Sequence, residues 1–509
     1  MQIDWEDHPR TVERVCPVCD SAGAKQVRLT VDPARVGQPR LQLLDCAECG
    51  SAFYDSLNRP PYDESSFGAG FVKYYIELGA GLDAMIDPLY RIDPSRVTNY
   101  LEIGCGFGFS LDFARYTFGW TAKGMDPSPL AAAGRDALGL DIVSAYLAGD
   151  TDFGTRFDLV LCSEVIEHLP APAELVQSMA RTLSADGILM LTTPNVRALR
   201  RDAPHEVLLS ILAPSFHLIL YSPESLELIL GKHGFPHVRV WEHANTLHAV
   251  ASLRPGTQPR EAAVDRGAYR RYLRARIADL RPDSPVVVGL TYRLFKELVN
   301  AGDFREADAV YQAMRDSCLR VYGIDMGAPA LLAFEAAPLL AFNEFAQRTS
   351  FNLCCALYFK GMCEFVDRRD YPRAIEYFRA ALRGGEVMLA QLSSICAVDC
   401  ETENLMSQAL IHTVYGLVFI DPAAALDEFM RLSAPLPSGG PGARCRRLPE
   451  ALIESVRGEL FLRLAQAGAH AEARVLRPGI AAALRFWLVT IKTKSFALAL
   501  RVRGRSTRP

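Results

Sequence analysis

The sequence predicts an α/β protein built on a largely parallel sheet, with a small cysteine-bearing module before it and an all-helical part after it. The first observation is a strand, a glycine-rich turn, a helix and a second strand over residues 97–126. The second is a pair of CxxC motifs near the start of the chain. The third is a helical pattern that continues almost throughout after residue 254. At 509 residues the chain exceeds the size at which single cores stop growing, so several domains are expected.

Residues 97–126 carry the most specific pattern of the chain. Residues 97–103 are mostly apolar or β-branched, as in a buried parallel strand, and 121–125 form a second short strand. Three glycines alternate in the turn after the first strand: Gly104, Gly106 and Gly108. Glycine accepts positive φ and lets a ligand approach the backbone closely. An open α/β sheet binds ligands at the carboxyl ends of its strands, where Glu102 and Asp126 fall. Because Asp126 can accept hydrogen bonds from both hydroxyls of a ribose, the segment predicts a nucleoside-like cofactor.

The glycine spacing separates two cofactor classes. The dinucleotide pattern G-x-G-x-x-G would need a glycine where this chain has Phe109. Residues 102–108, EIGCGFG, instead resemble motif I of the class I S-adenosylmethionine (SAM) methyltransferases. FDLVLCSEVIEHL (157–169) and GILMLTTPN (187–195) resemble the fourth and fifth strands of the group that includes the quinone O-methyltransferases. The resemblance covers roughly residues 97–253. It implies a Rossmann-like, seven-stranded methyltransferase sheet over 97–255 with an antiparallel last strand.

The resemblance also implies which residues hold SAM. They are the strand-end acids, the glycine turn and the ends of the third and fourth strands: Glu102, Gly104, Cys105, Gly106, Gly108, Asp126, Tyr146, Leu147 and Ser163. Adenine is expected at the end of the third strand, where Tyr146 can stack on the ring or Leu147 can cover it.

Glu164, Glu167 and His168 follow the fourth strand at positions i, i+3 and i+4, so a helix would place them on one face. The methyl group is expected to point toward this face. Three interpretations stay open. In the first, His168 is a general base. In the second, these three residues and His217 bind Mg²⁺ or Mn²⁺, as in some relatives with an E-x-x-E-H pattern. In the third, Glu167 and His168 only cap and pack the helix.

The N-terminal module is defined by four cysteines in two CxxC motifs: Cys16, Cys19, Cys46 and Cys49. Each motif puts two thiolates on one turn, and two turns complete a tetrahedron around Zn²⁺. The acidic start of the chain has no export signal, which favours metal-bound or reduced thiols over disulfides. We expect residues 1–58 to form a structural zinc ribbon, with two unmetallated pairs as the alternative. Because the segment is too short to build its own core, the metal would supply much of its folding free energy.

Aromatic residues follow the ribbon within a bridge over 59–96: Tyr62, Phe67, Phe71, Tyr74 and Tyr75. A ribbon, an aromatic bridge and a methyltransferase fold in this order resemble the sugar C-methyltransferases that act on nucleotide-linked deoxysugars. In that resemblance the bridge forms a lid over cofactor and substrate. The chain departs from that family after residue 253, where the family's C-terminal α/β domain is missing. The alternative is that these aromatics only pack the ribbon against the sheet.

The C-terminal half is predicted to be a linker (256–283), a helical domain (284–477) and a basic tail (478–509). Alanines at 307, 374, 425 and 473 follow turns, and in three cases an aromatic residue stands four positions later. This spacing resembles tetratricopeptide (TPR) repeats, which offer surfaces to partner proteins; a plain helical bundle is the alternative. The tail interleaves seven Lys or Arg with apolar residues and has no acid. It is expected either to contact an anionic membrane surface or to pack as a terminal helix.

Composition limits the remaining classes. A net charge of −4 argues against general nucleic-acid binding. Without a long uncharged apolar run or a signal peptide, the cytoplasm is the expected compartment, with peripheral contact at the inner membrane face through the tail. We therefore expect a SAM-dependent methyltransferase acting on a hydroxyl or carbon of a sugar, a glycan precursor or a related small molecule. The alternatives are a metal-assisted O-methyltransferase of a quinone-like molecule and a non-catalytic scaffold with a SAM-binding fold.

Overall fold

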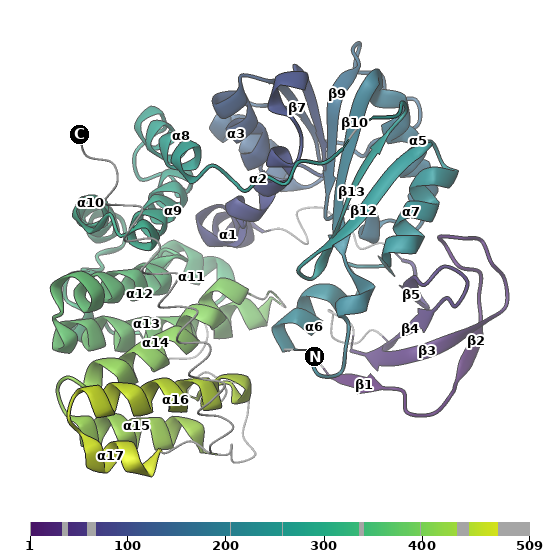
Figure 1. Cartoon of the computed structure of the whole chain (residues 1–509). Helices are drawn as coiled ribbons and strands as arrows, with labels where there is room; N and C mark the ends of the chain where they lie inside the picture. Colours follow the sequence, from purple (N-terminus) through teal and green to yellow (C-terminus); the bar gives the residue numbers. More distant parts are fainter. Residues whose placement is uncertain are drawn as a thin grey trace. The chain divides into compact units, whose positions relative to one another are not determined.

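The computed structural model describes residues 2–32, 39–58, 68–203, 205–256, 258–334, 340–395, 397, 399–434 and 447–476 (Figure 1). The chain divides into two compact units. Unit 1 comprises Met1–Leu294, Ala341–Arg348 and Ser393–Val398, and unit 2 comprises Phe295–Leu340, Thr349–Leu392 and Asp399–Pro509. The predicted basic tail, together with Tyr62 and Phe67 of the bridge, lies outside the described residues.

Unit 1 contains the predicted α/β sheet. Its strands are β6 (Asn99–Ile103), β7 (Thr121–Met125), β8 (Asp141–Val143), β9 (Phe157–Ser163), β10 (Leu183–Pro194), β12 (His237–His243) and β13 (Thr246–Ser252). They form one seven-stranded sheet in the order β12-β13-β10-β9-β6-β7-β8. The pairs β10–β9, β9–β6, β6–β7 and β7–β8 are parallel, whereas β13 runs antiparallel to both β10 and β12. The α/β class and the antiparallel last strand are therefore confirmed.

Helices lie on both faces of this sheet. They are α2 (Leu82–Tyr90), α3 (Phe109–Phe118), α4 (Pro129–Leu138), α5 (Pro172–Thr182) and α7 (Pro223–Lys232). The helix α6 (His205–Leu212) packs instead against the N-terminal strands, where Leu208 and Leu212 share a buried cluster with Leu43. Figure 1 shows α2 and α3 on one face and α5 and α7 on the other. Strand order reverses between β6 and β9, so a crevice is expected at the carboxyl ends of these two strands.

The segment expected to be a zinc ribbon (the ribbon) forms a second, six-stranded sheet together with one strand from later in unit 1. Its strands are β1 (Ile3–Trp5), β2 (Thr11–Glu13), β3 (Ala24–Val31), β4 (Leu41–Asp45), β5 (Ala52–Tyr54) and β11 (Ile219–Leu220). The last strand, β11, comes from the segment between α6 and α7. Ribbon residues such as Val27, Leu44 and Phe53 also share one buried cluster with Val160 and Leu191 of the larger sheet. The short segment therefore buries its apolar side chains in the core of unit 1.

The bridge and the predicted linker both contain helices. The bridge forms α1 (Ala69–Tyr74), a π-helical turn (Tyr75–Gly79) and α2. The linker prediction for 256–283 is wrong in its second half, because α8 (Arg266–Asp279) lies there. The Asp265 side chain caps α8, and Arg276 donates to Asp112 Oδ2 on α3 at 2.8 Å. The helix α9 (Pro285–Ala301) begins in unit 1 as well, as does α11 (Phe342–Arg348).

Unit 2 is all-helical, as predicted. Its helices are α10 (Phe304–Tyr322), α12 (Leu353–Cys363), α13 (Tyr371–Ser394), α14 (Cys400–Leu417), α15 (Pro422–Ser433), α16 (Glu450–Gln466) and α17 (His470–Val475), with a π-helical turn at Glu364–Arg368. Four of them, α10, α13, α15 and α17, begin within a few residues before the alanines that the sequence singled out. Ala307, Ala374 and Ala425 are fully buried. Their small side chains let neighbouring helices approach one another closely. The resemblance of this unit to TPR repeats remains a prediction.

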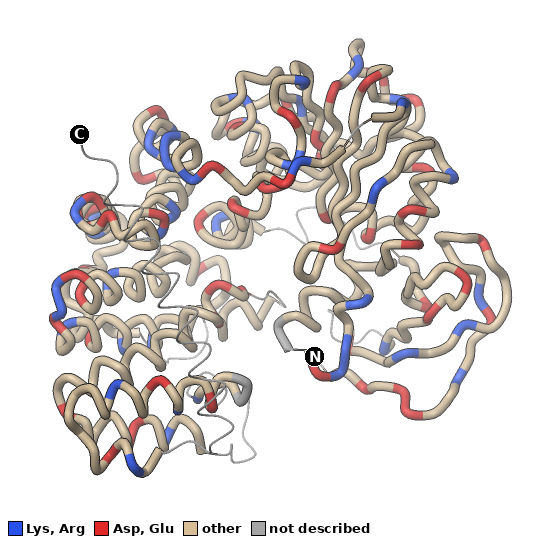
Figure 2. The backbone as a smooth tube through the Cα atoms, in the orientation of Figure 1, with Lys and Arg blue, Asp and Glu red and all other residues tan. Residues whose placement is uncertain are grey.

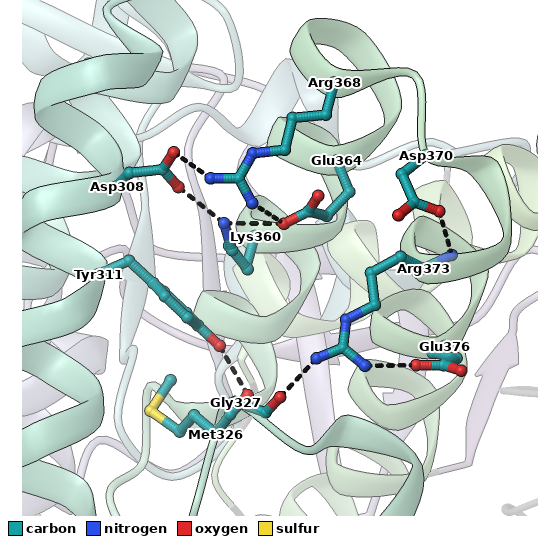
Figure 3. Close-up of polar contacts among 10 residues, drawn as sticks. All are labelled: Asp308, Tyr311, Met326, Gly327, Lys360, Glu364, Arg368, Asp370, Arg373 and Glu376. Carbon is teal, nitrogen blue, oxygen red and sulfur yellow. Dashed lines mark hydrogen bonds and ion pairs between the residues drawn. The ribbon is translucent and has the colours of Figure 1, made fainter.

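A buried ion-pair network joins α10 and α12 (Figure 3). Lys360 Nζ lies 2.7 Å from Asp308 Oδ1 and 2.8 Å from Glu364 Oε1, and Arg368 pairs with both acids. Because Lys360 and Glu364 are almost fully buried, removing either partner would leave an uncompensated charge. Nearby, Arg373 bridges Glu376 and the Gly327 carbonyl. Each charged group of the Lys360 network has a partner of opposite charge, so the network is interpreted as stabilising the helix packing.

Charges of both signs are interspersed along the backbone of each unit (Figure 2). Among the described residues, no helix combines the length and the apolar character needed to cross a membrane.

Candidate active site

The glycine turn after β6 has a conformation that only glycine adopts at low cost. The φ angles are +75° at Gly104, +51° at Gly106 and +82° at Gly108. A Cβ on Gly104 would lie 2.2 Å from Val165 Cγ2, in the loop after β9. The turn therefore needs glycine both for its backbone angles and for its contact with the neighbouring loop.

Asp126 is held against this turn by its own hydrogen bonds. Its Oδ2 accepts from the Gly106 amide at 2.9 Å, and its Oδ1 accepts from the Ser128 amide at 2.8 Å and the Ser128 hydroxyl at 2.5 Å. Ser128 thus occupies one oxygen, while Oδ2 keeps capacity for a second donor. The carboxylate is prepared to accept one hydroxyl of a ribose rather than both.

A pocket of about 440 Å³ opens at the carboxyl ends of β6, β7 and β9. This volume is within the range of small-molecule sites. Seven residues predicted from the sequence line it: Gly104, Gly106, Asp126, Tyr146, Leu147, Glu164 and His168. Sequence reasoning missed Ser128, Val165, Leu169 and Glu174. Tyr75, one of the bridge aromatics that the resemblance expects in a lid over cofactor and substrate, also lines the pocket. Ser128 could have been found, since it stands two residues after the strand-end acid.

Four other residues predicted to bind the cofactor do not line the pocket: Glu102, Cys105, Gly108 and Ser163. The Cys105 sulfur faces β7, where a Cβ on Gly124 would lie 2.7 Å from it. A Cβ on Gly108 would lie 2.7 Å from Leu140 Cδ1, on the core side of the turn. The Ser163 hydroxyl is 2.7 Å from Thr192 Oγ1 on β10. These residues therefore contact the turn and the strand ends on the side away from the pocket.

Glu102 is buried beneath the turn and accepts a hydrogen bond from the Ser110 hydroxyl on α3. Burial raises the pKa of Glu102 to about 8, and the charge of Asp126 acts in the same direction, while the Ser110 hydrogen bond opposes both. In the unfolded chain this carboxyl titrates near pH 4.3. Between these values the native state keeps a proton that the unfolded state has lost, so Glu102 lowers stability as pH rises.

We expect Glu102→Gln to flatten this pH dependence. The glutamine keeps an oxygen that can accept from Ser110 but cannot ionise. Its stability relative to the wild type should therefore increase from about pH 5 to about pH 9, by roughly 1 kcal/mol or more. Urea unfolding followed by tryptophan fluorescence at several pH values measures this difference. Parallel pH profiles for the two proteins would show that Glu102 does not titrate in this window.

The three residues after β9 do not share a helix face, contrary to the sequence prediction. Glu164 has φ of +55°, only Ile166–His168 form a short 3-10 helix, and α5 starts at Pro172. Pro170 and Pro172 explain the difference, because a residue before proline disfavours the helical region and proline offers no amide hydrogen. Glu164 lines the pocket and accepts from Thr192 Oγ1 at 3.1 Å.

The structure instead brings Glu167 and His168 together with His217. Glu167 Oε1 lies 3.7 Å from His168 Nε2 and 4.0 Å from His217 Nε2. These three residues form a candidate metal cluster, of which Glu164 is not a member. Glu167 Oε2 accepts from Thr193 Oγ1 at 2.9 Å, whereas the buried Oε1 accepts no hydrogen bond from the described residues.

Both imidazoles present the same nitrogen to Glu167. His168 Nδ1–H donates to the Phe216 carbonyl and His217 Nδ1–H donates to the Ile211 carbonyl, each at 2.8 Å. The Nε2 lone pairs therefore face Glu167 Oε1. Burial lowers the pKa of His168 and lowers that of His217 to about 3, so both rings are neutral. Backbone-anchored neutral imidazoles beside a carboxylate are typical of metal ligands.

Residues 75–240 match the family described as "Methyltransferase domain". They form a methyltransferase domain. Among curated proteins, the chain is 30% identical over 133 residues to the ubiquinone biosynthesis O-methyltransferase of Proteus mirabilis, covering 22% of this chain and 54% of that protein. It is 32% identical over 106 residues to the ubiquinone biosynthesis O-methyltransferase of Actinobacillus pleuropneumoniae, covering 19% of this chain and 45% of that protein. The chain thus spans about half the length of the curated relatives it matches.

Solved structures show the same kind of likeness at lower identity. An O-methyltransferase family protein from Burkholderia thailandensis has 14% sequence identity and a TM-score of 0.33, with 40% of this chain and 66% of that chain covered. The plantazolicin methyltransferase bound to S-adenosylhomocysteine (SAH) has 15% identity and a TM-score of 0.30, covering 38% and 93%.

The four cysteines ahead of the methyltransferase domain lie together. The Cys16 and Cys49 sulfurs are 3.7 Å apart, as are those of Cys19 and Cys46, and all four sulfurs lie within 4.8 Å of one another. Each CxxC turn closes with an amide from the residue after it, Asp20 to Cys16 and Gly50 to Cys46. The four-thiolate arrangement fits a closed tetrahedral Zn²⁺ site.

The ribbon also supports the segment that carries His217. Strand β5 pairs with β11, and the Tyr54 amide donates to the Leu218 carbonyl at 3.0 Å. The Tyr54 hydroxyl donates to the Leu212 carbonyl at 3.0 Å, and the Leu218 amide donates to the Glu167 carbonyl at 2.7 Å. The cysteine module therefore braces the loop that orients both histidines of the cluster.

Proposed function

We propose that this protein transfers the methyl group of SAM to a hydroxyl of a small molecule, with a divalent cation held by Glu167, His168 and His217. The observation that carries the proposal is the position of this cluster. His168 lines the same pocket as the glycine turn and Asp126. A cofactor bound along the turn would bring its reactive end to the residues after β9, where His168 lies.

The residues present fit SAM. Gly104 and Gly106 give the ligand access to the backbone, and Asp126 Oδ2 can accept a ribose hydroxyl. Tyr146 and Leu147 line the part of the pocket where adenine was expected. Alignment of the methyl group with the acceptor and exclusion of water would supply most of the rate enhancement.

The donor set of the cluster suits some cations better than others. Two imidazoles and one carboxylate with open positions match Mn²⁺ or Zn²⁺, whereas Mg²⁺ prefers oxygen ligands and near-ideal octahedral geometry. A bound cation would act as a Lewis acid toward an acceptor hydroxyl, favouring its deprotonated form. Without a cation, the neutral His168 could take that proton as a general base, which is the rival mechanism.

Two acceptor classes are supported by different features. The names of the curated relatives favour a phenolic hydroxyl on a quinone-like ring. The order of ribbon, aromatic bridge and methyltransferase domain favours a hydroxyl of a sugar or glycan precursor. The helical unit 2 would serve a protein partner in either case.

Calorimetry with SAH tests cofactor binding. We expect wild-type protein to bind SAH in the micromolar range and Asp126→Ala to bind about tenfold more weakly, because it loses a charge-assisted acceptor for the ribose. Absence of SAH binding to the wild type at high micromolar concentration would favour the scaffold alternative. Assays of phenolic and sugar acceptors with labelled SAM then separate the two substrate classes.

Glu167→Gln tests the metal. The substitution keeps the oxygen that accepts from Thr193 but removes the charge. We expect Mn²⁺ affinity to fall at least tenfold, since a carboxylate ligand is lost, with SAH affinity changed less than about twofold. Glu174→Gln is the matched control, because Glu174 lines the same pocket but lies outside the cluster. Equal Mn²⁺ affinity in Glu167→Gln and wild type would leave His168 as a base acting alone.

A further inference from the structure

Tyr75 brings a side chain from the bridge into the cofactor pocket. It is the first residue of the π-helical turn Tyr75–Gly79, and it lines the pocket. Its hydroxyl lies 3.0 Å from the position that a Cβ on Gly106 would take. Burial raises its pKa and the neighbouring charge of Asp126 acts in the same direction, so the hydroxyl stays protonated and can donate a hydrogen bond to a ligand. The orientation of the π-helical turn therefore determines whether the Tyr75 side chain lies against the glycine turn.

Arg293, on α9, hydrogen-bonds to the backbone of the π-helical turn Tyr75–Gly79. The residue is 5% exposed, and its guanidinium donates to the carbonyls of Ile76 at 3.0 Å and Leu78 at 3.3 Å. The same group lies 5.5 Å above the ring of Phe109, the first residue of α3. A buried cation is thus balanced by backbone carbonyls near the end of a helical turn and by an aromatic face.

Gly289, one turn before Arg293 on α9, lets the helix approach this closely. A Cβ at Gly289 would lie 2.4 Å from the Ile76 carbonyl oxygen and 3.0 Å from Glu77 Cα. The helix therefore contacts the backbone of the turn directly. Arg293 and Ile76 are 217 residues apart in the sequence, and α9 lies beyond the matched methyltransferase region.

We propose that Arg293 is a positioning residue for the cofactor, which fixes the turn at 75–79 so that Tyr75 faces the glycine turn. The inference rests on the proposed SAM site. Arginine suits the task because its planar fork reaches two carbonyls at once, whereas the ammonium of lysine acts as a single point. A helix that follows the methyltransferase fold in the sequence thus becomes part of the cofactor site.

SAH affinity, measured by calorimetry on the full-length chain, tests this role. We expect Arg293→Met to weaken SAH binding about tenfold and Arg293→Lys to weaken it less, because lysine keeps the charge but loses the fork. Arg276→Met is the matched control: Arg276 is also largely buried and ties α8 to Asp112, away from the turn. Its SAH affinity should stay within about twofold of the wild type.

A double-mutant cycle separates positioning from a general loss of stability. If Arg293 acts through Tyr75, then Tyr75→Ala and the double variant Tyr75→Ala/Arg293→Met should bind SAH equally weakly. Additive losses would overturn the proposal, as would an unchanged affinity in Arg293→Met. If Arg293→Met does not fold, Arg293→Lys alone and combined with Tyr75→Ala completes the cycle. Failure of the wild type to bind SAH would instead contradict the proposed function itself.

Discussion

We expect the four-cysteine cluster to bind Zn²⁺, so Cys46→Ser should lower the zinc content of the protein and destabilise unit 1. Cys46 is 1% exposed, and its sulfur lies within 4.8 Å of three other cysteine sulfurs. A structural Zn²⁺ contributes on the order of 10 kcal/mol to folding in small zinc modules, so losing one of four ligands is expected to cost about 3 kcal/mol or more. Elemental analysis and thermal unfolding of the full-length chain measure both effects.

The effect should extend beyond the ribbon. Since β5 and Tyr54 brace the segment 211–218, loosening the ribbon should also weaken Mn²⁺ binding at the Glu167 cluster. Cys318→Ser, at a similarly buried cysteine of α10 outside the cluster, is the control and should keep its zinc. The full chain is required, because a fragment ending at residue 58 would lack β11. A wild type with less than half an equivalent of zinc would contradict the zinc assignment.

Gly104→Ala should strongly weaken cofactor binding. The substitution puts a Cβ on a residue at φ +75°, which costs roughly 1–2 kcal/mol, and places that carbon 2.2 Å from Val165 Cγ2. Either the turn or the loop after β9 must move, and both line the pocket. We expect calorimetry to show SAH affinity reduced more than tenfold. The free energy of unfolding should fall by less than the binding free energy does.

Gly119→Ala is the matched control for backbone strain. Gly119 ends α3 at φ +74°, but no atom of the described residues lies within 4 Å of a Cβ built there. This variant should lose about 1 kcal/mol of stability and keep its affinity for SAH. Similar affinities in the two alanine variants would show that the approach of the turn to Val165 is not needed for binding.

Local patterns predicted much of the methyltransferase sheet. The apolar runs at 99–103 and 157–163 became adjacent parallel strands, and the glycine turn between β6 and α3 has positive φ at all three glycines. These signals succeed here because strands that are buried on both faces have nearly continuous apolar sequences, and because glycine is the residue that adopts positive φ at low cost. The linker prediction failed because Arg254–Pro259 signals a break locally, while the helix α8 that follows depends on packing against α3.

The site was predicted in part, and its errors have physical causes. The i, i+3, i+4 spacing of Glu164, Glu167 and His168 assumed a helix that two prolines prevent. The burial of Glu102 and Cys105 could not be predicted from the sequence. Glu102 falls at a strand end and Cys105 in a turn, and the sequence does not show which side of the turn faces the ligand and which faces the core. The resemblance named His217 as a candidate metal ligand, and the structure places it beside Glu167, but only its backbone bond to Ile211 shows which nitrogen faces Glu167.

Local sequence patterns were enough to predict the class of the fold, the glycine turn, the strand-end acid and the two CxxC motifs. Each of these depends on residues within a few positions of one another, so local conformational preferences suffice. Three features became visible only in the folded chain: β11 pairs with the ribbon, Glu167 lies beside two histidines, and Arg293 hydrogen-bonds to the turn that carries Tyr75. These contacts join segments some 50 to more than 200 residues apart, and they form because buried polar groups must find partners wherever the packed chain provides them.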